Sequence, residues 1–518
     1  MARRFLPAIV LLSVILHGIG IARSSLPAQD GLKFLRVARQ FHTMPWVDVV
    51  RGTDQHPLYP ACIAAAHPFV SLWTGSEPDS WRITAQIVSA LAAIATIFPL
   101  FALARALFDE GVATLCALLF VLLPLPSAVG HDTLSDPLAL FLIVSALALG
   151  ETALRRNCIK SAIGCGIVSG LGYLARPEVA IVPLAVLITG ISRMRLPDRV
   201  MSRALACQAL SFLAVVGSYA VVKGELSEKL ALRRAVGISS THDAKPGAER
   251  ALPPGLNASE WDFAAKEESD HPSHLTRVEA CVRLASRWGE AMGYALVPFA
   301  IWGLWRRSRS LGTLLLVIYA FVFSVILIRH AMKFGYLSSR HTLSLVLVSL
   351  PFASFAMMRM AACVRARLMS AGADSPRSRV VRRGAAITAI LVIAVGAQLH
   401  HAPHVSRWGH GEAGRWLASH SAGNEKVLDT RGWATFVSER PAHDYWHVRQ
   451  AIVDPALAYV VVDEDERTAS SRRGETLRAI LAYAAEPIAE FPDRRGADTI
   501  GVRIYRFHPP TDWKGMRP

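Results

Sequence analysis

Acidic and cationic side chains stand in a few short polar stretches of this otherwise apolar sequence. Asp30 lies in QDGLKFLRVA, Asp132 and Asp136 lie in HDTLSDPL, and Arg176 lies in LARPEV. A carboxylate can accept a proton from a reacting hydroxyl, and an arginine presents a planar fork of donors to a phosphate. Together these residue types could displace a phosphate, because the cation stabilises the charge that develops on the leaving group.

A second cationic stretch, RHAMKFGYLSSRHTL, lies later in the chain. It contains Arg329, Lys333, Arg340 and His341. By the topology argued below, this stretch faces the outer side of a membrane, where Lys and Arg are normally scarce. An anionic ligand at the outer face would explain the charge, and loose contact with lipid headgroups is the simpler alternative.

A stiff polar segment, HPLYP, begins at His56 between two apolar regions. Its two prolines fix the backbone and restrict the direction in which His56 can point. Asp54 precedes this segment and Tyr59 lies within it, so both are further candidates for a substrate site. A turn that leads into an interfacial helix would also account for the segment.

Each of these charged residues has a structural interpretation as well. Asp30 could cap the helix that begins beside it, and Asp136, which precedes a proline, could do the same for another helix. Arg176 could simply pair with Glu178. Two acids and a histidine beside a membrane span nevertheless carry a desolvation cost, which favours a functional use for those in HDTLSDPL.

The composition indicates a protein that crosses a membrane many times. Of its 518 residues, 52% are hydrophobic and only 19% are charged, and the mean hydropathy is +0.33. Soluble domains seldom have this balance. The formal net charge of +16 could suggest nucleic acid, but in a membrane protein Lys and Arg concentrate in cytoplasmic loops. We therefore expect a lipid bilayer as a partner and no nucleic acid.

Apolar runs predict about eleven transmembrane helices. The first run resembles a signal peptide but is long enough to span, so we interpret it as an uncleaved helix. The two runs that flank Arg176 have only about 15 residues each, roughly 22 Å of helix against a hydrocarbon core of about 30 Å, and one long kinked helix is the alternative. The predicted spans are approximately 5–22, 84–107, 111–129, 137–154, 161–175, 177–192, 204–222, 291–305, 311–328, 341–360 and 384–400.

Loop charge orients these spans. If the first arginines are cytoplasmic, the alternating loops, such as ALRRNCIK and WRRSRS, hold most of the cations of the short loops. Merging the two short spans would place SRMRLPDRVMSR and WRRSRS outside, against the positive-inside rule, so two short helices are favoured. The N-terminus is then cytoplasmic, in a cell (inner) membrane. An odd number of spans places the C-terminal region outside, together with loops at about 23–83 and 223–290.

The outer regions contain predicted structure of their own. In the first outer loop, Phe34, Leu35 and Ala38 fall on one face of a cationic amphipathic helix suited to the membrane interface. After a transmembrane domain over residues 1–402, residues 403–518 alternate helix-like and strand-like pieces such as GEAGRWLASH and TIGVRIYRF. We expect a mainly α, polytopic membrane protein with interfacial helices in the first outer loop and a small extracytoplasmic α/β domain.

The pattern of cysteines and glycines indicates no cofactor. The seven cysteines are scattered singly without a CxxC pair, which is typical of small core residues and not of a metal or disulfide framework. Neither a dinucleotide-binding glycine fingerprint nor a phosphate loop occurs, so a soluble nucleotide cofactor is not indicated.

With these motifs in this order, the chain resembles the GT-C class of membrane glycosyltransferases. More narrowly, it is similar to the bacterial family of the aminoarabinose transferase of lipid A and the protein O-mannosyltransferases. The resemblance rests on QDGLKFLRVA, HPLYP, LSDPL, ARPE and YLSSRHTL, and covers roughly residues 5–400 by order and spacing. It implies transfer of a hexosyl or pentosyl group from a polyprenyl-phosphate sugar to a lipid, glycan or protein acceptor at the outer face of the membrane.

The resemblance also implies roles for individual residues. Asp30 would be the principal carboxylate, acting as general base on the acceptor hydroxyl or orienting it. Asp136 would be a second catalytic carboxylate at the acceptor entrance. The donor phosphate would be bound by His56, Arg176 and Arg340. Further candidates for lining the substrate site are Tyr59, Asp54, Asp132 and Lys333.

Two departures from the family pattern stand out. Gly31 and Phe34 replace an acidic residue and a tyrosine of the usual first motif. Gln55 stands where some relatives carry a metal-binding Glu, and a neutral amide is a poor ligand for a divalent ion. This argues against a metal cofactor, although Asp54 could substitute as a ligand.

Two other classes of protein are alternatives. A transporter or flippase of lipid-linked sugars would carry ionisable residues near the span centres and repeated halves, and the sequence shows neither. A non-catalytic scaffold that presents the outer domain would leave Asp30, His56 and Arg340 free to change.

Overall fold

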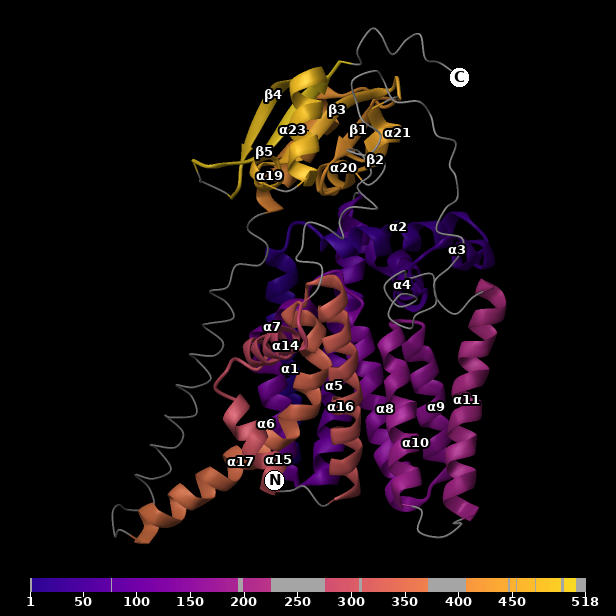
Figure 1. The fold of residues 1–518 in the computed structure, drawn as a ribbon, viewed down its shortest axis with the longest axis vertical. Helices are drawn as coiled ribbons and strands as arrows, with labels where there is room; N and C mark the ends of the chain where they lie inside the picture. Colours follow the sequence, from indigo (N-terminus) through magenta and orange to yellow (C-terminus); the bar gives the residue numbers. More distant parts are fainter. Residues whose placement is uncertain are drawn as a thin grey trace.

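A computed structural model shows a bundle of long helices with a layer of short helices and a small sheet domain at one end (Figure 1). The N-terminus lies near the opposite end of the bundle (Figure 1). The structure describes residues 2–75, 77–193, 199–224, 275–306, 310–370, 407–445, 448–452, 454–470, 472–494 and 498–508.

Six helical segments of the described chain are long and apolar enough to cross a membrane. A bent pair, α6 (Glu110–Leu122) and α7 (Pro124–Gly130), turns by 65° and could form a seventh span. The bend lies at Leu123, whose extended backbone is the conformation expected before a proline. The six are α1 (Leu6–Arg23), α5 (Asp79–Leu107), α8 (Asp136–Arg156), α11 (Arg199–Lys223), α16 (Leu311–Phe334), and Ser339–Val364, which joins η4 (Ser339–Thr342) to most of α17 (Leu343–Ser370).

Six or seven spans are fewer than the eleven predicted, and length explains much of the difference. Three predicted spans correspond to α9 (Ile159–Tyr173), α10 (Ile181–Arg193) and α15 (Val297–Arg306), which have 15, 13 and 10 residues. At 1.5 Å per residue, all three are shorter than a hydrocarbon core of about 30 Å. The predicted span 384–400 lies outside the described residues, as does most of the predicted outer loop 223–290.

Two separate short helices, not one kinked helix, flank Arg176. After α9 the chain passes through Arg176, which is extended, and the short helix η2 (Pro177–Ala180) before α10 begins. The proline disfavours helical backbone at the residue before it, which explains the break. Both α9 and α10 pack against α8, so the chain reverses between them.

The first outer loop forms three helices across one end of the bundle: α2 (Gln29–Thr43), α3 (Trp46–Gly52) and α4 (Leu58–Thr74) (Figure 1). The predicted apolar face of α2 exists, since Phe34, Leu35 and Ala38 are all buried. That face packs on α4 and α5 and not outward. The most exposed apolar side chains of this loop belong to α4, where Trp73 is 82% exposed.

The C-terminal part of the described chain contains a five-stranded sheet of order β2-β1-β3-β5-β4. β1 runs parallel to β2 and β3, and β5 runs antiparallel to β3 and β4. Successive residues of β3 enter two different apolar clusters, so both faces of the sheet are covered. The strands are β1 (Lys426–Asp429), β2 (Ala442–Asp444), β3 (Leu457–Asp463), β4 (Ala485–Pro492) and β5 (Ile500–Phe507); the helices are α19 (Trp408–His420), α20 (Trp433–Ser438), α21 (Val448–Ile452), α22 (Glu464–Thr468) and α23 (Arg472–Ala484).

This sheet domain rests on the layer of short helices through α20, which contacts α2 (Figure 1). Arg39 of α2 pairs with Glu439 at 3.2 Å, and Phe436 of α20 joins the apolar cluster beneath α2. Gly432, with φ +80°, makes the turn into α20, and a Cβ there would lie 3.2 Å from Leu32 of α2. The sheet domain and the first outer loop therefore lie at the same end of the bundle.

Candidate active site

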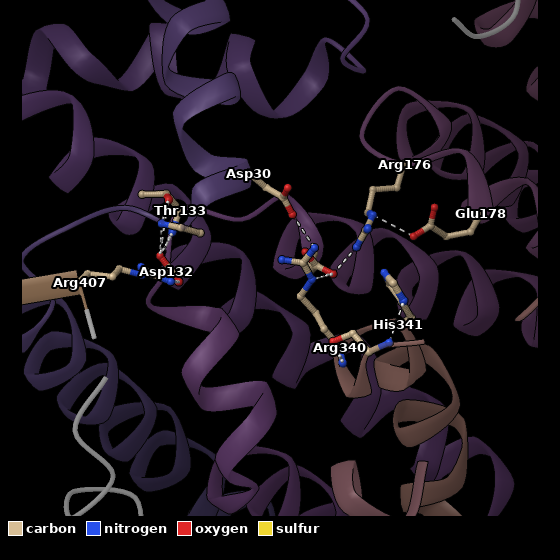
Figure 2. A network of polar contacts seen from close by, with 11 residues as sticks. Asp30, Asp132, Thr133, Arg176, Glu178, Arg340, His341 and Arg407 are labelled. Atoms are coloured by element: carbon tan, nitrogen blue, oxygen red, sulfur yellow. Dashed lines mark hydrogen bonds and ion pairs between the residues drawn. The ribbon is translucent and has the colours of Figure 1, made fainter. Parts of the chain in front are cut away.

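Four separate elements bring their charged side chains into one chain of ion pairs (Figure 2). Asp30 of α2 accepts a hydrogen bond from Arg340 of η4, with 2.6 Å between Oδ2 and Nη2. Arg340 approaches Asp136 of α8, with 3.8 Å between Nε and Oδ1. Asp136 also pairs with Arg176, whose Nε lies 2.9 Å from Glu178. Residues more than 300 positions apart in the chain thus share one network.

The network lines a cavity of about 290 Å³. Its lining includes three carboxylates and three cations, so the two signs of charge are matched before any ligand binds. An anion that enters must therefore compete with the carboxylates for the cations. The lining residues are Asp30, Lys33, Phe34, Asp54, Gln55, Leu134, Ser135, Asp136, Arg176 and Arg340.

Asp30 stands in the first turn of α2 and does not cap it. The N-cap position is Ala28, so the capping interpretation of Asp30 is wrong. The carboxylate points to Arg340 and is 54% exposed. Next to it, Gly31 permits a close approach, since a Cβ at this position would lie 1.9 Å from Oγ1 of Thr133. This contact gives a physical reason for glycine where the family pattern has an acid.

Asp136 is the first residue of α8, after the N-cap Ser135, and its side chain is 5% exposed. Its carboxylate bonds Arg176 and not the backbone amides of α8, so capping does not account for it. A carboxylate this deeply buried requires cations beside it. Asp136 thereby holds Arg176 and Arg340 on opposite sides of one carboxylate, both facing the cavity.

Arg340 is positioned by a tight turn after α16. The Ser338 hydroxyl accepts a bond from the Arg340 amide at 3.4 Å, and His341 Nδ1 accepts one from the Ser338 amide at 3.3 Å. Helix α14 (Arg277–Ala291), within the predicted outer loop 223–290, supports this turn from the side. There Ser339 donates to Glu290 at 2.7 Å. The turn presents Arg340 toward α2 with its side chain 25% exposed.

Burial and charge act in opposite directions on Asp30. Burial raises its pKa, but the charge of Arg340 and its hydrogen bond, with smaller contributions from Lys33 and Arg176, lower the pKa below its ordinary value overall. The carboxylate is therefore ionised at neutral pH, and Arg340 holds it in that state. Removal of Arg340 from Asp30 would take away the strongest of the contributions that lower its pKa and make the carboxylate more basic.

The predicted site residues separate into two groups. The structure brings Asp30, Asp54, Asp136, Arg176 and Arg340 to the cavity. The other predicted residues, His56, Tyr59, Asp132 and Lys333, are not among the described residues that line it.

The residues outside the cavity lining have other surroundings. His56, predicted to bind the donor phosphate, is buried with its ring centroid 5.4 Å from Tyr173 and 6.2 Å from Tyr219. Tyr59 is fully buried and donates to the Ala85 carbonyl at 3.1 Å. Lys333 lies in the last turn of α16.

Asp132 is buried in the turn before α8. It accepts bonds from the amides of Ala28 and Thr133 at 2.9 and 2.8 Å. These contacts place Asp132 beneath the start of α2, behind the cavity and not in it.

Lys33 is a lining residue that was not predicted from the sequence. Lys33 is three residues after Asp30, a spacing that places both on one side of α2, and this signal could have identified it. Arg407, which pairs with Asp132 at 3.5 Å, gave no comparable signal, because it lies in none of the charged motifs of the sequence.

No group of three or more His, Cys, Asp or Glu side chains in the described part of the chain has the geometry to hold a metal ion. Asp54 and Gln55 do line the cavity, beside the carboxylate of Asp30. The amide of Gln55 is a poor ligand for a divalent ion.

Comparisons with known proteins extend these observations. Residues 75–221 match the family described as dolichyl-phosphate-mannose-protein mannosyltransferase. No curated protein matches the sequence. The match covers α5 to α11, the part of the bundle that contributes Asp136 and Arg176.

Several solved structures share the fold. ArnT from Cupriavidus metallidurans bound to undecaprenyl phosphate matches with a TM-score of 0.61 at 14% identity, over 97% of this chain and 98% of that chain. The oligosaccharyltransferase of Archaeoglobus fulgidus in the apo form matches with a TM-score of 0.55 at 14% identity, over 99% and 74% of the two chains. AglB from Archaeoglobus fulgidus, in complex with an inhibitory peptide and a dolichol-phosphate, matches at 0.52 with 14% identity, over 98% and 76%. The family match and these shared folds confirm the resemblance of the chain to the GT-C membrane glycosyltransferases.

Proposed function

We propose that this protein is a glycosyltransferase that moves a sugar from a polyprenyl-phosphate donor to an acceptor hydroxyl at the outer face of the membrane. The observation that carries the proposal is the cavity in which Asp30, Arg340, Asp136 and Arg176 form one ion-pair network. Similar folds have been solved with undecaprenyl phosphate and with a dolichol-phosphate, which supports a lipid-linked donor.

The cations of the cavity suit the donor phosphate. A guanidinium has five N–H donors, more than the contacts of Arg340 with Asp30 and Asp136 require, and can bind phosphate in bidentate fashion. Arg176 lies across Asp136 from Arg340, and Lys33 adds a third cation to the lining. We assign the phosphate to Arg340 and Arg176, which would stabilise it as it leaves the sugar.

Binding of the phosphate would also prepare the base. When Arg340 turns its donors to the phosphate, Asp30 loses the strongest of the cations that lower its pKa, and the carboxylate becomes more basic. Asp30 then accepts the proton of the acceptor hydroxyl. The hydroxyl oxygen forms a bond to the sugar carbon, the bond from that carbon to the phosphate oxygen breaks, and the polyprenyl phosphate leaves with the electron pair.

The distribution of charge along the bundle supports an outer-face reaction. Helix α8 begins beside the cavity at Asp136 and ends at Arg155 and Arg156, at the other end of the bundle. Cations at that end favour a cytoplasmic location for it and for the N-terminus. By the same argument, the cavity and the C-terminal α/β domain would be extracytoplasmic, and a reporter fused after residue 518 should be active only outside.

A transfer assay tests the proposal. We expect the purified protein to transfer sugar from a polyprenyl-phosphate sugar, and Asp30→Asn to lower kcat by about 10²- to 10⁴-fold, the range for loss of a general base. Asp48→Asn is the matched control, because Asp48 is an exposed acid of the neighbouring helix α3 and does not line the cavity. Normal turnover by Asp30→Asn would reject the role of Asp30. Movement of the intact lipid-linked sugar across vesicles without cleavage would favour a flippase.

A further inference from the structure

We infer that Arg407, at the start of the sheet domain, and Asp132, in the turn before α8, form a positioning pair that sets the location of Asp30. The inference rests on the proposed function, because it concerns the placement of the carboxylate assigned as the base. Figure 2 shows the pair on the side of Asp30 away from Arg176. Neither residue lines the cavity in the described structure, so their effect on chemistry would be indirect.

Asp132 holds the start of α2 in place through a hydrogen bond. Its Oδ1 accepts a hydrogen bond from the amide of Ala28 at 2.9 Å, and the Thr133 hydroxyl lies 2.8 Å from the same amide. Ala28 is the N-cap of α2, and its amide has no helical partner of its own. Asp30 follows two residues later, so the position of the Ala28 amide determines where its carboxylate stands.

The sheet domain holds the segment just before α2. The Arg407 guanidinium donates to the Leu26 carbonyl at 3.1 Å and lies 3.5 Å from the second oxygen of Asp132. The indole of Trp433 donates to the Pro27 carbonyl at 2.9 Å. Arg407 in turn lies over the Trp433 ring, 5.2 Å from its centroid. Three successive residues, 26 to 28, are thus held by groups from outside the first loop.

Both members of the pair are largely buried. The side chains of Asp132 and Arg407 are 3% and 12% exposed. A buried charge that loses its partner is costly to keep in place, whereas exposed pairs contribute little. Asp132 therefore holds the Ala28 amide most firmly when Arg407 balances its charge. Docking of the sheet domain would in this way complete the geometry of the active site, and displacement of about 1 Å at a reacting group can cost on the order of 100-fold in rate.

The test uses the full-length protein and two matched arginines of the same region. Arg407→Gln should lower kcat about tenfold or more and leave the donor KM within about twofold, because the phosphate-binding arginines stay in place. Arg415→Gln is the control, since Arg415 is 58% exposed on α19, where it pairs with Glu412 and lies over the Trp408 ring, and no described contact joins it to Asp132 or to residues 26–28. Arg407→Lys, which keeps the charge, should recover part of the loss.

A second readout does not depend on catalysis. Amide hydrogen exchange in a peptide spanning residues 24–32 should be faster in Arg407→Gln and in Asp132→Ala than in the parent. Asp132→Asn, which keeps an oxygen to accept from Ala28, should lie between Asp132→Ala and the parent in both exchange and kcat. Wild-type kcat together with wild-type exchange in Arg407→Gln would overturn the inference, as would an equal effect of Arg415→Gln.

The two proposals fail in different ways. If the parent protein transfers no sugar but Arg407→Gln still accelerates exchange at residues 24–32, the coupling stands and the proposed function fails. If the parent is active and Arg407→Gln loosens this segment without a change in kcat, the transferase function stands and the positioning role is rejected.

Discussion

Two clusters of charged residues in this protein invite comparison, one in the cavity and one in the sheet domain. In the sheet domain, both oxygens of Asp463 are occupied: one accepts from the Asp465 amide at 3.0 Å, and the other lies 3.1 Å from Arg431 and 3.2 Å from His410. Its side chain is 16% exposed. In the cavity, Asp30 is 54% exposed, and among the described residues only Arg340 bonds it, through one oxygen.

The difference teaches what distinguishes a reactive carboxylate from a structural one. The pKa of both groups is lowered by neighbouring cations against the effect of burial, so pKa alone does not separate them. What separates them is the number of lone pairs already used and the presence of open space. Asp463 caps α22 and ties β3 to α19, whereas Asp30 shares its cation with a cavity that can admit a phosphate.

The largest expected effect comes from Arg340, because its charge acts on both the phosphate and Asp30. Arg340→Gln should reduce kcat by about 10²- to 10³-fold, the usual loss when one donor to a developing negative charge is removed. Steady-state transfer kinetics measure it. Arg36→Gln on α2 is the control, since Arg36 is exposed and is not a lining residue. A loss confined to KM would show that Arg340 binds the donor without stabilising the transition state.

The same variant should change the pH dependence. In the parent, the lowered pKa of Asp30 keeps the base ionised, so activity should fall only as pH drops through a value below about 3.9, the ordinary aspartate pKa. Without Arg340, the largest contribution that lowers the pKa of Asp30 is lost, so this pKa rises and the acidic limb of kcat/KM should move to higher pH. Profiles of both proteins measure the shift. If the acidic limb of Arg340→Gln stays at the same pH or moves to lower pH, the assignment of that limb to Asp30 is contradicted.

A smaller effect is expected at Gly31. Gly31→Ala places a Cβ where Thr133 Oγ1 stands, so the start of α2 must move, which we expect to cost about 1–3 kcal/mol of stability. Activity should fall as well, because Asp30 moves with the backbone. Thermal unfolding and transfer assays measure the two effects. Gly18→Ala in α1 is the control, since nothing lies within 4 Å of a Cβ there.

The smallest effect on catalysis is expected in the sheet domain. Asp463→Asn should destabilise the protein by about 1–3 kcal/mol, because Arg431 loses a charged partner, and should leave kcat within about twofold. Denaturant unfolding and transfer kinetics measure it, with the exposed Asp498→Asn as control. A large loss of kcat without a loss of stability would show that the Asp463 cluster belongs to the active site after all.

Much of the candidate site could be predicted because its residues break the local pattern. Asp30, Asp136, Arg176 and Arg340 are charged residues at the ends of apolar segments, a placement that is costly unless the charges meet. The capping interpretations of Asp30 and Asp136 failed because capping is a local rule, whereas each carboxylate found a cation from a distant segment.

Other residues could not be placed in this way. HPLYP directs His56 between two tyrosines, Tyr173 from α9 and Tyr219 from α11, that no local pattern connects to it. The eleven predicted spans show the same limit. Hydropathy identified apolar segments that form helices, but α9, α10 and α15, with 15, 13 and 10 residues, are shorter than the predicted spans needed to be for the count of eleven to be confirmed.

The sequence by itself determined the membrane class, the order of the apolar helices and the charged residues at their ends, because hydropathy and unmatched charge are properties of short segments. Only the tertiary structure decided which of those charges face a shared cavity and which form structural contacts inside the fold. Asp132 and Asp136 are four residues apart, yet one accepts from Ala28 behind α2 and the other from Arg176 at the cavity. That division depends on how distant helices pack, since a carboxylate is satisfied by whichever donor the fold brings within about 3 Å.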